Sequence, residues 1–574
     1  MASIPFREFL VLPTTLSYIL VQHRPDLLLF SRPTYVGTWV QLWLLQFVAF
    51  AIWSVLLYPK YFSPLRHLPS PKGGSWWNGQ FGRIAKEPTG APMLDWVHEV
   101  PNDGIIRYLS LLNQEKILVT NAKALSEVLT TKNYDFIKPT TVRIGLGRLL
   151  GIGVLLAEGD EHKMQRKNLM PAFAFRHVKD LYAVFWDKSC EAIHAMTVEV
   201  KAKERGEIPS EPFVDKSENA DEPLPVPVAE KGVAYMEAME WASRATLDII
   251  GTAGLGQNFG AIQDPNTVLN RTYRSVFKPT PIAQLLGFLN TFLPGWFVSR
   301  IPVKRNGEIE AAAAVIRSTC RQLINQKKEK LAKKELNDVD ILSVALESGG
   351  FSDENLIDQL MTFLAAGHET TASAMTWAIY LLCVHPEVQS RLREEVRSRL
   401  PSPDSTATVT SQDIDHMPYL NAVCNEVLRY FSPVPLTLRE AAVDTTLVGQ
   451  RIPKGTKVLI VPWATNKDEA LWGADARKFN PDRWMPRDGD ARSTSGGASS
   501  NYAFLTFLHG PRSCIGQAFA KAEFACLLAA WVGRFRFELQ DGRLLDERNL
   551  IIKGGVTARP AKGLHVKVGV VEGW

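Results

Sequence analysis

The stretch that decides the fold of this chain is Phe507-Leu508-His509-Gly510-Pro511-Arg512-Ser513-Cys514-Ile515-Gly516. An apolar run typical of a strand, residues 502–508, precedes its turn, and an alanine-rich run typical of a helix, residues 517–531, follows it. Because two glycines and a proline lie between these runs, we expect a tight turn. Cys514 would lie just before the helix, where the macrodipole favours a thiolate, and Arg512 adds a nearby positive charge. A lone thiolate on a rigid loop suits a metal that needs one protein ligand. A buried cysteine at a strand–helix junction is the alternative.

The full spacing, Phe-x-x-Gly-x-Arg-x-Cys-x-Gly, resembles the haem-thiolate signature of the cytochrome P450 monooxygenases. The resemblance implies that Cys514 is the axial ligand of the iron of a haem b and that Phe507 packs beside its sulfur. It further implies that Arg512 binds a haem propionate, and that Gly510 and Gly516 let the backbone approach the cofactor.

A second motif lies inside a long helical run, residues 353–384, and reads Ala365-Ala366-Gly367-His368-Glu369-Thr370-Thr371. The glycine weakens the helix locally, and a carboxylate beside a hydroxyl in an apolar helix can relay protons. A glycine-kinked core helix is the alternative. The motif resembles the oxygen-activating helix of the same family, which implies that Thr370 assists oxygen activation and that Glu369 helps to deliver protons.

Two further groups of residues resemble propionate ligands of that family. His162 and Arg166 share one face of a helix that begins near residue 158, where the family usually has tryptophan and arginine. The histidine, with Pro171-Ala172-Phe173 after it, resembles filamentous-fungal members. A solvated charged helix is the alternative. Arg439, on a predicted strand, resembles another propionate ligand.

Glu426-x-x-Arg429 and Phe479-x-Pro481-x-Arg483-Trp484 resemble a buried ion network of the family. We expect Glu426, Arg429 and Arg483 to be structural, because removing one partner from such a network costs on the order of 3–5 kcal/mol.

The N-terminal region, residues 1–58, is predicted to be a membrane anchor. Residues 36–58 carry no charge and, at about 1.5 Å per residue, would cross a hydrocarbon core of roughly 30 Å as a helix. A buried core helix is the alternative. Residues 9–21 are also apolar but are interrupted by Pro13 and too short to span, so we expect an interfacial or hairpin-like segment. Residues 59–74 form a proline-rich hinge. Flanking charges leave the orientation undecided; the family resemblance implies a single-pass protein of the endoplasmic reticulum with its catalytic domain in the cytosol.

The remaining residues, 75–574, are predicted to form one mainly α domain with a small β-rich lobe, the cytochrome P450 fold. We expect an exposed acidic, proline-rich insertion over residues 206–231. Residues 133–156 are rich in glycine and are expected to form a flexible loop over the haem, with Arg143 and Ile144 as pocket candidates. Residues 276–301 are apolar and either belong to the core or dip into the membrane.

Composition limits the partners. A net charge of +5 over 574 residues, with no basic stripe, argues against nucleic acid. Six scattered cysteines indicate a reducing compartment. Because no nucleotide-binding or flavin motif is visible, we expect electrons to come from a separate NADPH–cytochrome reductase, with cytochrome b5 as a second candidate donor. Lys163, Lys167 and Lys521 are candidates for its docking face.

The predicted function is therefore a membrane-bound monooxygenase that inserts one oxygen atom from O2 into a hydrophobic small molecule. Hydroxylation or epoxidation in fungal secondary metabolism is the favoured role, and oxidation of fatty acids or xenobiotics is the alternative. A thiolate-haem isomerase or dehydratase and a non-enzymatic haem-binding membrane protein are the more distant alternatives.

Overall fold

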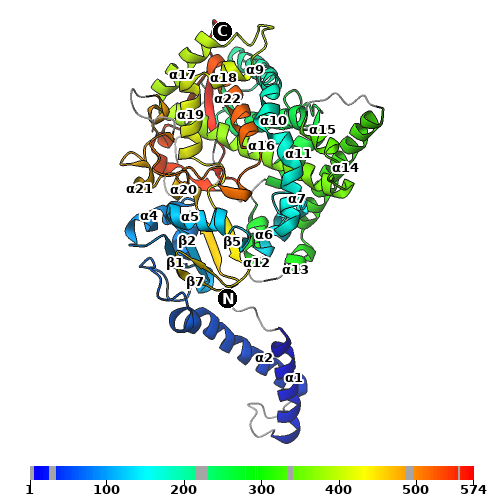
Figure 1. Ribbon diagram of the computed structural model, residues 1–574, viewed down its shortest axis with the longest axis vertical. Helices are drawn as coiled ribbons and strands as arrows, with labels where there is room; N and C mark the ends of the chain where they lie inside the picture. The colour runs from blue at the N-terminus through cyan, green and yellow to red at the C-terminus, as the bar shows by residue number, and fades with distance from the viewer. Residues whose placement is uncertain are drawn as a thin grey trace.

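The computed structural model describes residues 6–24, 34–214, 230–277, 280–290, 293, 295–333, 340–486, 495–553 and 556–574. A mainly helical body carries its largest sheet at one end, and a helical hairpin, α1 and α2, projects beyond that end (Figure 1). This arrangement confirms the predicted fold class. The larger helices of the body are α4 (Ala91–Glu99), α6 (Thr140–Leu150), α7 (Gly159–Leu169), α9 (Tyr182–Arg205), α10 (Ala238–Ile249), α11 (Val268–Phe277), α12 (Pro281–Leu289), α14 (Lys304–Ala332), α16 (Asp353–Val384), α17 (Pro386–Arg399), α19 (Pro418–Tyr430) and α22 (Gln517–Arg534). Shorter ones are α3 (Phe81–Lys86), α5 (Ala122–Ser126), α8 (Phe175–Val178), α13 (Gly295–Arg300), α15 (Ile341–Glu347), α18 (Ser411–Asp415), α20 (Pro462–Thr465) and α21 (Glu469–Trp472).

Helix α16 is the central element of the body. Ser352 caps its start by accepting a hydrogen bond from the backbone N–H of Asn355, and Asp353 and Glu354 complement the helix dipole in the first turn. The residues from Thr371 to Cys383 are all buried, and α16 packs against α10, α14 and α22. A helix that is apolar on all sides is the expected core of a large domain.

Small sheets complete the body. A five-stranded sheet has the order β1-β2-β8-β5-β3, and residues 104–120 form an antiparallel hairpin in which Ile105 pairs with Val119. Its strands are β1 (Ile105–Leu109), β2 (Glu115–Val119), β3 (Phe136–Ile137), β5 (Thr437–Ala441) and β8 (Lys457–Ile460). The other sheets are β4 (Ala234–Glu237) with β12 (His565–Val570) and β9 (Phe535–Leu539), β6 (Thr445–Leu447) with β7 (Gln450–Ile452), and β10 (Ile552–Lys553) with β11 (Arg559–Pro560).

Two local predictions were wrong. The glycine-rich segment expected to be a flexible loop forms α6, which follows Pro139 and ends at Gly151, where φ is +67°. The apolar run expected to be a strand, residues 502–508, is irregular: the N–H of Leu508 donates to the carbonyl of Leu505, and the φ of Leu508 is +55°. Residues 215–229, most of the predicted insertion, lie outside the described residues.

The anchor is a helical hairpin. Helix α1 (Phe6–His23) continues through Pro13, so the proline does not break it as expected. Helix α2 (Tyr35–Ile52) continues as the π-helix η2 (Trp53–Phe62), which extends four residues past the predicted end of the span. The indole N–H of Trp39 donates to the Thr14 hydroxyl at 3.0 Å, which ties the two helices together.

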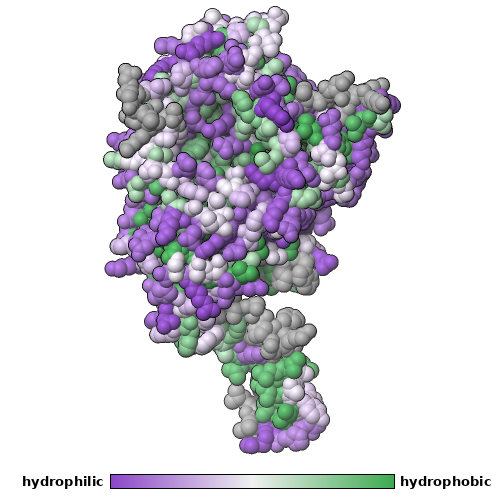
Figure 2. All heavy atoms as spheres, in the orientation of Figure 1, coloured by the Kyte–Doolittle hydropathy of each residue, from purple (hydrophilic) through white to green (hydrophobic). Residues whose placement is uncertain are grey.

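The continuous helix Tyr35–Phe62 is the one candidate membrane span among the described residues; its best window has a mean hydropathy of 2.0, and only 6% of that window is buried. Figure 2 shows apolar surface gathered on this hairpin, whereas the visible face of the body is mostly hydrophilic. An exposed apolar helix of this length fits a membrane anchor.

Candidate active site

The turn that carries Cys514 is held by its own backbone. A 3-10 turn, Gly510–Arg512, precedes the cysteine, and the N–H of Cys514 donates to the carbonyl of Phe507 at 2.8 Å. Gly510 has a φ of +74°, and a Cβ there would lie 2.1 Å from the carbonyl oxygen of Leu129. Glycine is therefore required at this position by packing within the protein, in addition to the approach to a cofactor expected from the sequence.

The thiol of Cys514 lies deep in the body and still faces open space. Burial raises its pKa, yet the cysteine is exposed. The backbone N–H of Gly516 and the charge of Arg166 act in the opposite direction and lower the pKa. The cation that favours the thiolate is thus Arg166, whereas the sequence suggested Arg512.

Arg512 belongs instead to a buried cluster of positive charges. It forms an ion pair with Glu158, donates to the carbonyl of Ala157 at 3.1 Å, and leaves its Nε atom without a partner within the described residues. Arg439 is only 2% exposed, and burial together with the charge of Arg512 lowers its pKa to about 10. Burial and the same two guanidinium groups lower the pKa of Lys138 well below its usual value.

This cluster has more positive than negative charge. Lys138, Arg439 and Arg512 surround the single carboxylate of Glu158, to which the backbone N–H of Lys138 also donates at 2.9 Å. Buried charges of one sign require a compensating partner. A ligand with carboxylate groups would supply it.

The predicted pair on α7 lies beside this cluster. His162 is 2% exposed, and burial with the charges of Arg512 and Arg166 lowers its pKa to about 4, so the imidazole is neutral at pH 7. Its Nδ1 atom lies 3.2 Å from the hydroxyl of Tyr134. Arg166 contacts the cysteine turn directly: it donates to the carbonyl oxygen of Ser513 at 2.6 Å and to its hydroxyl at 3.1 Å.

The motif on α16 presents Glu369 and Thr370 in different directions. The hydroxyl of Thr370 donates to the carbonyl of Ala366 at 2.8 Å. The buried carboxylate of Glu369 accepts from the hydroxyl of Thr557 at 2.9 Å and from Arg559 at 3.2 Å. Burial raises the pKa of Glu369, and Arg559 and Thr557 partly offset this by stabilising the anion.

One face of α16 is accessible in the middle of an otherwise buried helix. Ala366 is exposed and Thr370 is half-buried, although the next thirteen residues, Thr371 to Cys383, are all buried. Because the helix crosses the interior of the body, this accessible face lines a space inside the protein. Val434 and Leu436, which lie between α19 and β5, are also half-buried.

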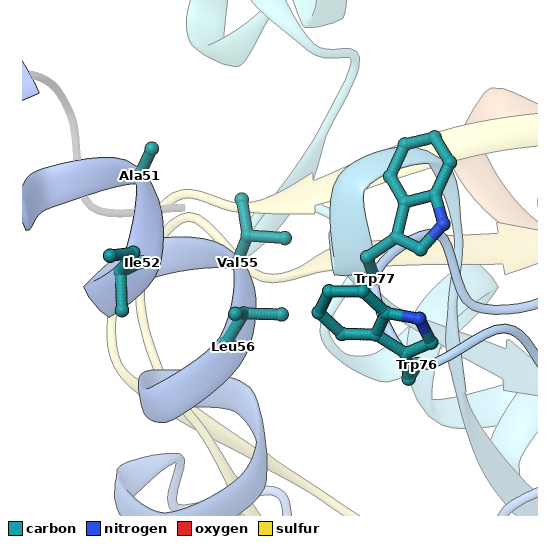
Figure 3. Close-up of a pocket in the computed structure, with 6 residues that line it drawn as sticks. All are labelled: Ala51, Ile52, Val55, Leu56, Trp76 and Trp77. Atoms are coloured by element: carbon teal, nitrogen blue, oxygen red, sulfur yellow. The ribbon is translucent and has the colours of Figure 1, made fainter. Parts of the chain in front are cut away.

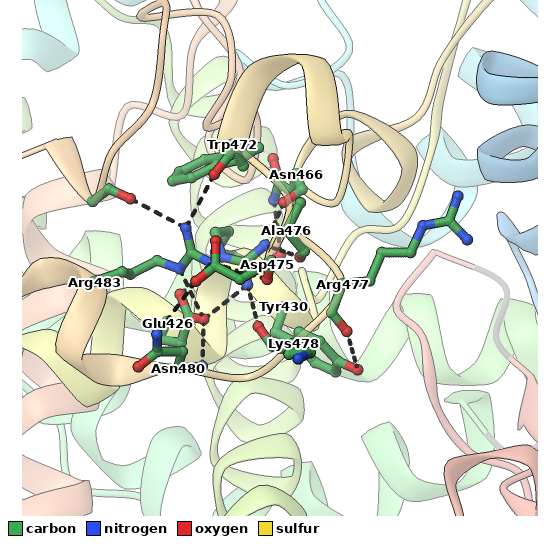
Figure 4. Close-up of polar contacts among 12 residues, drawn as sticks. Glu426, Tyr430, Asn466, Trp472, Asp475, Ala476, Arg477, Lys478, Asn480 and Arg483 are labelled. Atoms are coloured by element: carbon green, nitrogen blue, oxygen red, sulfur yellow. Dashed lines mark hydrogen bonds and ion pairs between the residues drawn. The ribbon is translucent and has the colours of Figure 1, made fainter.

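The predicted ion network around Glu426 is confirmed and is shown in Figure 4. Arg429 donates two hydrogen bonds of 2.8 Å to the carboxylate of Glu426, and both side chains are fully buried. Arg483 approaches the same carboxylate at 3.3 Å, and Trp484 donates to it at 2.9 Å. The remaining N–H groups of Arg429 donate to the carbonyls of Asn466, Ala476 and Lys478. These residues fix the chain that leads to the cysteine turn and do not face the open space.

Sequence reasoning missed Lys138, Tyr134, Glu158 and Arg559. Each lies outside the quoted motifs and reaches the site only through the fold. The one available signal was a charged residue next to a Pro or Gly, as in Lys138-Pro139 and Glu158-Gly159.

The residues present fit a haem. A thiol faces an internal space, the orphaned Nε of Arg512 and the excess of buried cations suit two propionates, and an accessible helix face with few polar groups suits the porphyrin and an apolar ligand. A Cβ on Gly516 would contact only Phe173, at 3.7 Å, so the protein alone does not explain that glycine.

The comparison with protein families decides the identity. The model of the cytochrome P450 family matches residues 69–566. The chain belongs to the cytochrome P450 family. Relatives include the cytochrome P450 monooxygenase ALT8 of Alternaria alternata, 46% identical over 91% of this chain and 92% of that protein. Others are FUM15 of Gibberella moniliformis, 44% identical over 90% of each chain, and sphH of Aspergillus fumigatus, 46% identical over 91% of each.

The fold agrees with that of a solved P450. A crystal structure of a variant of the cytochrome P450DA heme domain matches with a TM-score of 0.68 at 19% identity, and covers 88% of this chain and 98% of its own. This P450 is thus a monooxygenase, an oxidoreductase that uses O2, a redox partner and a haem iron with a thiolate ligand.

Proposed function

We propose that this P450 is a haem b monooxygenase of the endoplasmic reticulum membrane that hydroxylates or epoxidises a lipid-soluble metabolite, in a fungal secondary-metabolite pathway. The observation that carries the proposal is the thiol of Cys514, which faces an internal space beside a cluster of buried cations. The similarity to monooxygenases of filamentous fungi supports the choice of pathway class.

Cys514 is the proposed iron ligand. The haem, when bound, supplies the activation of O2 and the transfer of one oxygen atom to the substrate. The N–H of Gly516 and the guanidinium of Arg166 stabilise the negative charge on the sulfur, and Phe507 lies in the turn that holds the cysteine backbone. Arg512, Arg439, Lys138 and His162 are the proposed partners of the propionates.

Glu369 and Thr370 are the proposed proton carriers. The hydroxyl of Thr370 donates its hydrogen to the carbonyl of Ala366, so its oxygen can accept a hydrogen bond from the open space. The buried carboxyl of Glu369, held by Thr557 and Arg559, is the group that can take up and release a proton. Arg559 is partly exposed, with 24% of its side-chain surface accessible, so the carboxyl that it pairs with lies close to the solvent.

The electron donor is proposed to be an NADPH–cytochrome reductase, with cytochrome b5 as a second donor. Lys163 and Lys167 on α7 are exposed and suit an acidic partner, whereas Lys521 is half-buried over Phe504 and Phe507 and contributes less to the docking face than expected. The anchor helix places the catalytic domain, residues 75–574, at the cytosolic membrane surface in this proposal.

The absorption spectrum of the reduced, carbon-monoxide-bound protein tests the proposal. We expect the long-wavelength Soret band of a thiolate-ligated haem, lost in Cys514→Ala and kept in the matched control Cys424→Ala, a buried cysteine on α19. An unchanged band in Cys514→Ala, or the shorter-wavelength band of imidazole ligation in the wild type, would overturn the ligand assignment. Product formation without NADPH would indicate an isomerase or dehydratase instead.

A further inference from the structure

An open apolar groove lies where the anchor meets the body (Figure 3). Its volume is about 400 Å³, within the range of roughly 300–1,000 Å³ typical of ligand pockets. Val55 and Leu56 of η2 point toward two indole rings on the opposite wall. All six lining residues are apolar: Ala51, Ile52, Val55, Leu56, Trp76 and Trp77.

The two tryptophans that form one wall are unusually exposed. Trp76 is 76% exposed and Trp77 is 46% exposed. A tryptophan that becomes buried removes roughly 150–250 Å² of surface from water. Burying these two adjacent indoles against a partner would therefore give a large gain in hydrophobic free energy. Single exposed apolar residues are ordinary, but a continuous apolar patch marks a contact surface.

The walls of the groove are held in place by the same buried side chain. Asn113, 5% exposed, donates from its Nδ2 atom to the carbonyl of Val55 at 2.8 Å and to the carbonyl of Trp76 at 2.9 Å. Arg107 donates to the carbonyl of Pro59 at 2.6 Å and pairs with Glu115 at 2.7 Å. These hydrogen bonds fix the end of the helix to the body and therefore fix the shape of the groove.

The surroundings of the groove have the composition of a membrane boundary. Trp53, Tyr61 and Phe62 are exposed on the same helix, and Lys60 lies between them and is exposed as well. Tryptophan and tyrosine gather at the level of lipid headgroups, and lysine and arginine lie beside the cytoplasmic leaflet. The groove is also continuous with the candidate span Tyr35–Phe62, since four of its six residues belong to that helix.

We propose that this groove binds an acyl chain of a membrane phospholipid and that Trp76 and Trp77 form a second membrane contact, next to the anchor. A phospholipid is the favoured occupant, because every lining side chain is apolar, the groove is open along the anchor, and the aromatic residues beside it mark the headgroup level. The inference rests on the proposed membrane location of the anchor and is independent of the oxidation chemistry.

The test uses the full-length protein in nanodiscs whose phosphatidylcholine carries bromine atoms on the upper part of the acyl chain. Bromine quenches the fluorescence of tryptophan at short range. The variant Trp76→Phe/Trp77→Phe removes two of the fifteen tryptophans. The matched control is Trp574→Phe, which removes an indole at the C-terminus, at the opposite end of the body. The carbon monoxide spectrum of each variant checks that the haem site is intact.

We expect the double variant to lose a distinct part of the bromine-dependent quenching, and the control to lose none. Equal quenching in the double variant and the wild type would overturn the inference. Quenching of the two tryptophans by aqueous acrylamide and not by bromine would also overturn the inference, because it would show a water-exposed loop. Quenching by neither agent would overturn it as well, because it would show that a second protein chain covers the pair. If bromine quenches no tryptophan at all, the proposed anchor itself fails, and the two failures are thereby distinguished.

Discussion

At the scale of single residues, Glu369 and Thr370 are neighbours in sequence but do not contact each other. The carboxylate is held by Thr557 and Arg559, and the hydroxyl is held by the backbone of its own helix. Consecutive helical positions point about 100° apart, which explains the divergence. Proton transfer from one to the other therefore requires either rotation of the carboxyl or a bridging water.

The first prediction concerns Thr370. Replacement by alanine should leave haem binding intact and divert electrons to hydrogen peroxide, so that product formed per NADPH falls by about tenfold or more, because general acid catalysis contributes on this scale or above. Thr376→Ala is the matched control, since it removes the same kind of bond, to the carbonyl of Ala372 at 2.8 Å, from a buried part of the helix. Full coupling in Thr370→Ala would contradict the assigned role.

The motif residues could be predicted from the sequence, and their partners could not. Cys514, Thr370 and Arg429 stand in short patterns in which spacing alone carries the information. Lys138 and Glu158 meet Arg512 only because a short strand and the start of α7 are brought together by the fold. The expectation that Arg512 would be the cation acting on Cys514 failed for the same reason, since Arg166 reaches the turn from α7.

At the scale of elements, the helix after the cysteine and the helix with Thr370 are joined by one buried hydrogen bond. The hydroxyl of Thr371 donates to Glu523 of α22 at 2.9 Å, and the other carboxyl oxygen of Glu523 has no partner within the described residues. Glu523 is fully buried, and burial raises its pKa well above its usual value. Burial thus favours the neutral form of this carboxyl.

This predicts a dependence of stability on pH. Because the folded protein binds the proton of Glu523 more tightly than the unfolded chain does, its contribution is complete below the usual pKa of glutamate and is lost as pH rises towards the folded pKa, by up to about 1.4 kcal/mol per pH unit. Glu523→Gln keeps the acceptor for Thr371 and cannot ionise. The Tm of the wild type relative to this variant should therefore fall between pH 5 and pH 8. A difference that stays constant over this range would show that Glu523 does not retain its proton.

The ion network of α19 gives a third prediction. Arg429→Ala leaves Glu426 fully buried without its main partner, at a cost on the order of 3–5 kcal/mol. We expect loss of haem incorporation and little folded protein, measured by the absorbance of bound haem per protein. Lys163→Ala, which removes an exposed ion pair with Asp160 at 2.8 Å, is the control and should be nearly neutral. Normal haem content in Arg429→Ala would contradict the structural role.

Elements were predictable where periodicity was strong. The long helical pattern of residues 353–384 predicted α16 with its limits. Helices α6 and α1 were not predicted, because the glycines of α6 and Pro13 of α1 have a low helix propensity. Packing against α14 and α2, respectively, overrides this propensity. For residues 502–508 the error was the opposite one: a strand was predicted, but the apolar residues pack into the core without pairing as a strand.

At the scale of the whole molecule, α7 joins the buried cluster of positive charges around Arg512 to the surface. Its buried face carries His162, and its exposed face carries Lys163 and Lys167. A partner bound there would lie close to the turn of Cys514, since Arg166 of the same helix bonds Ser513.

The corresponding prediction is that Lys163→Glu/Lys167→Glu lowers the rate at limiting NADPH–cytochrome reductase several-fold, most strongly at low ionic strength, because charge steering is screened by salt. The carbon monoxide spectrum should be unchanged. Lys304→Glu, at an exposed lysine on α14, is the control. Equal apparent affinity for the reductase in all three proteins would place the docking face elsewhere.

The junction at Pro59 has a mechanical consequence. Arg107 donates to the carbonyl of Pro59 and Asn113 donates to the carbonyl of Val55, both near the end of the helix. The helix and the body therefore rotate as one unit. A spanning helix that is longer than the local hydrocarbon thickness adapts by tilting. In this molecule such a tilt is passed on to the whole catalytic body, which makes the thickness of the host bilayer a mechanical input that sets the angle at which the enzyme faces the lipid.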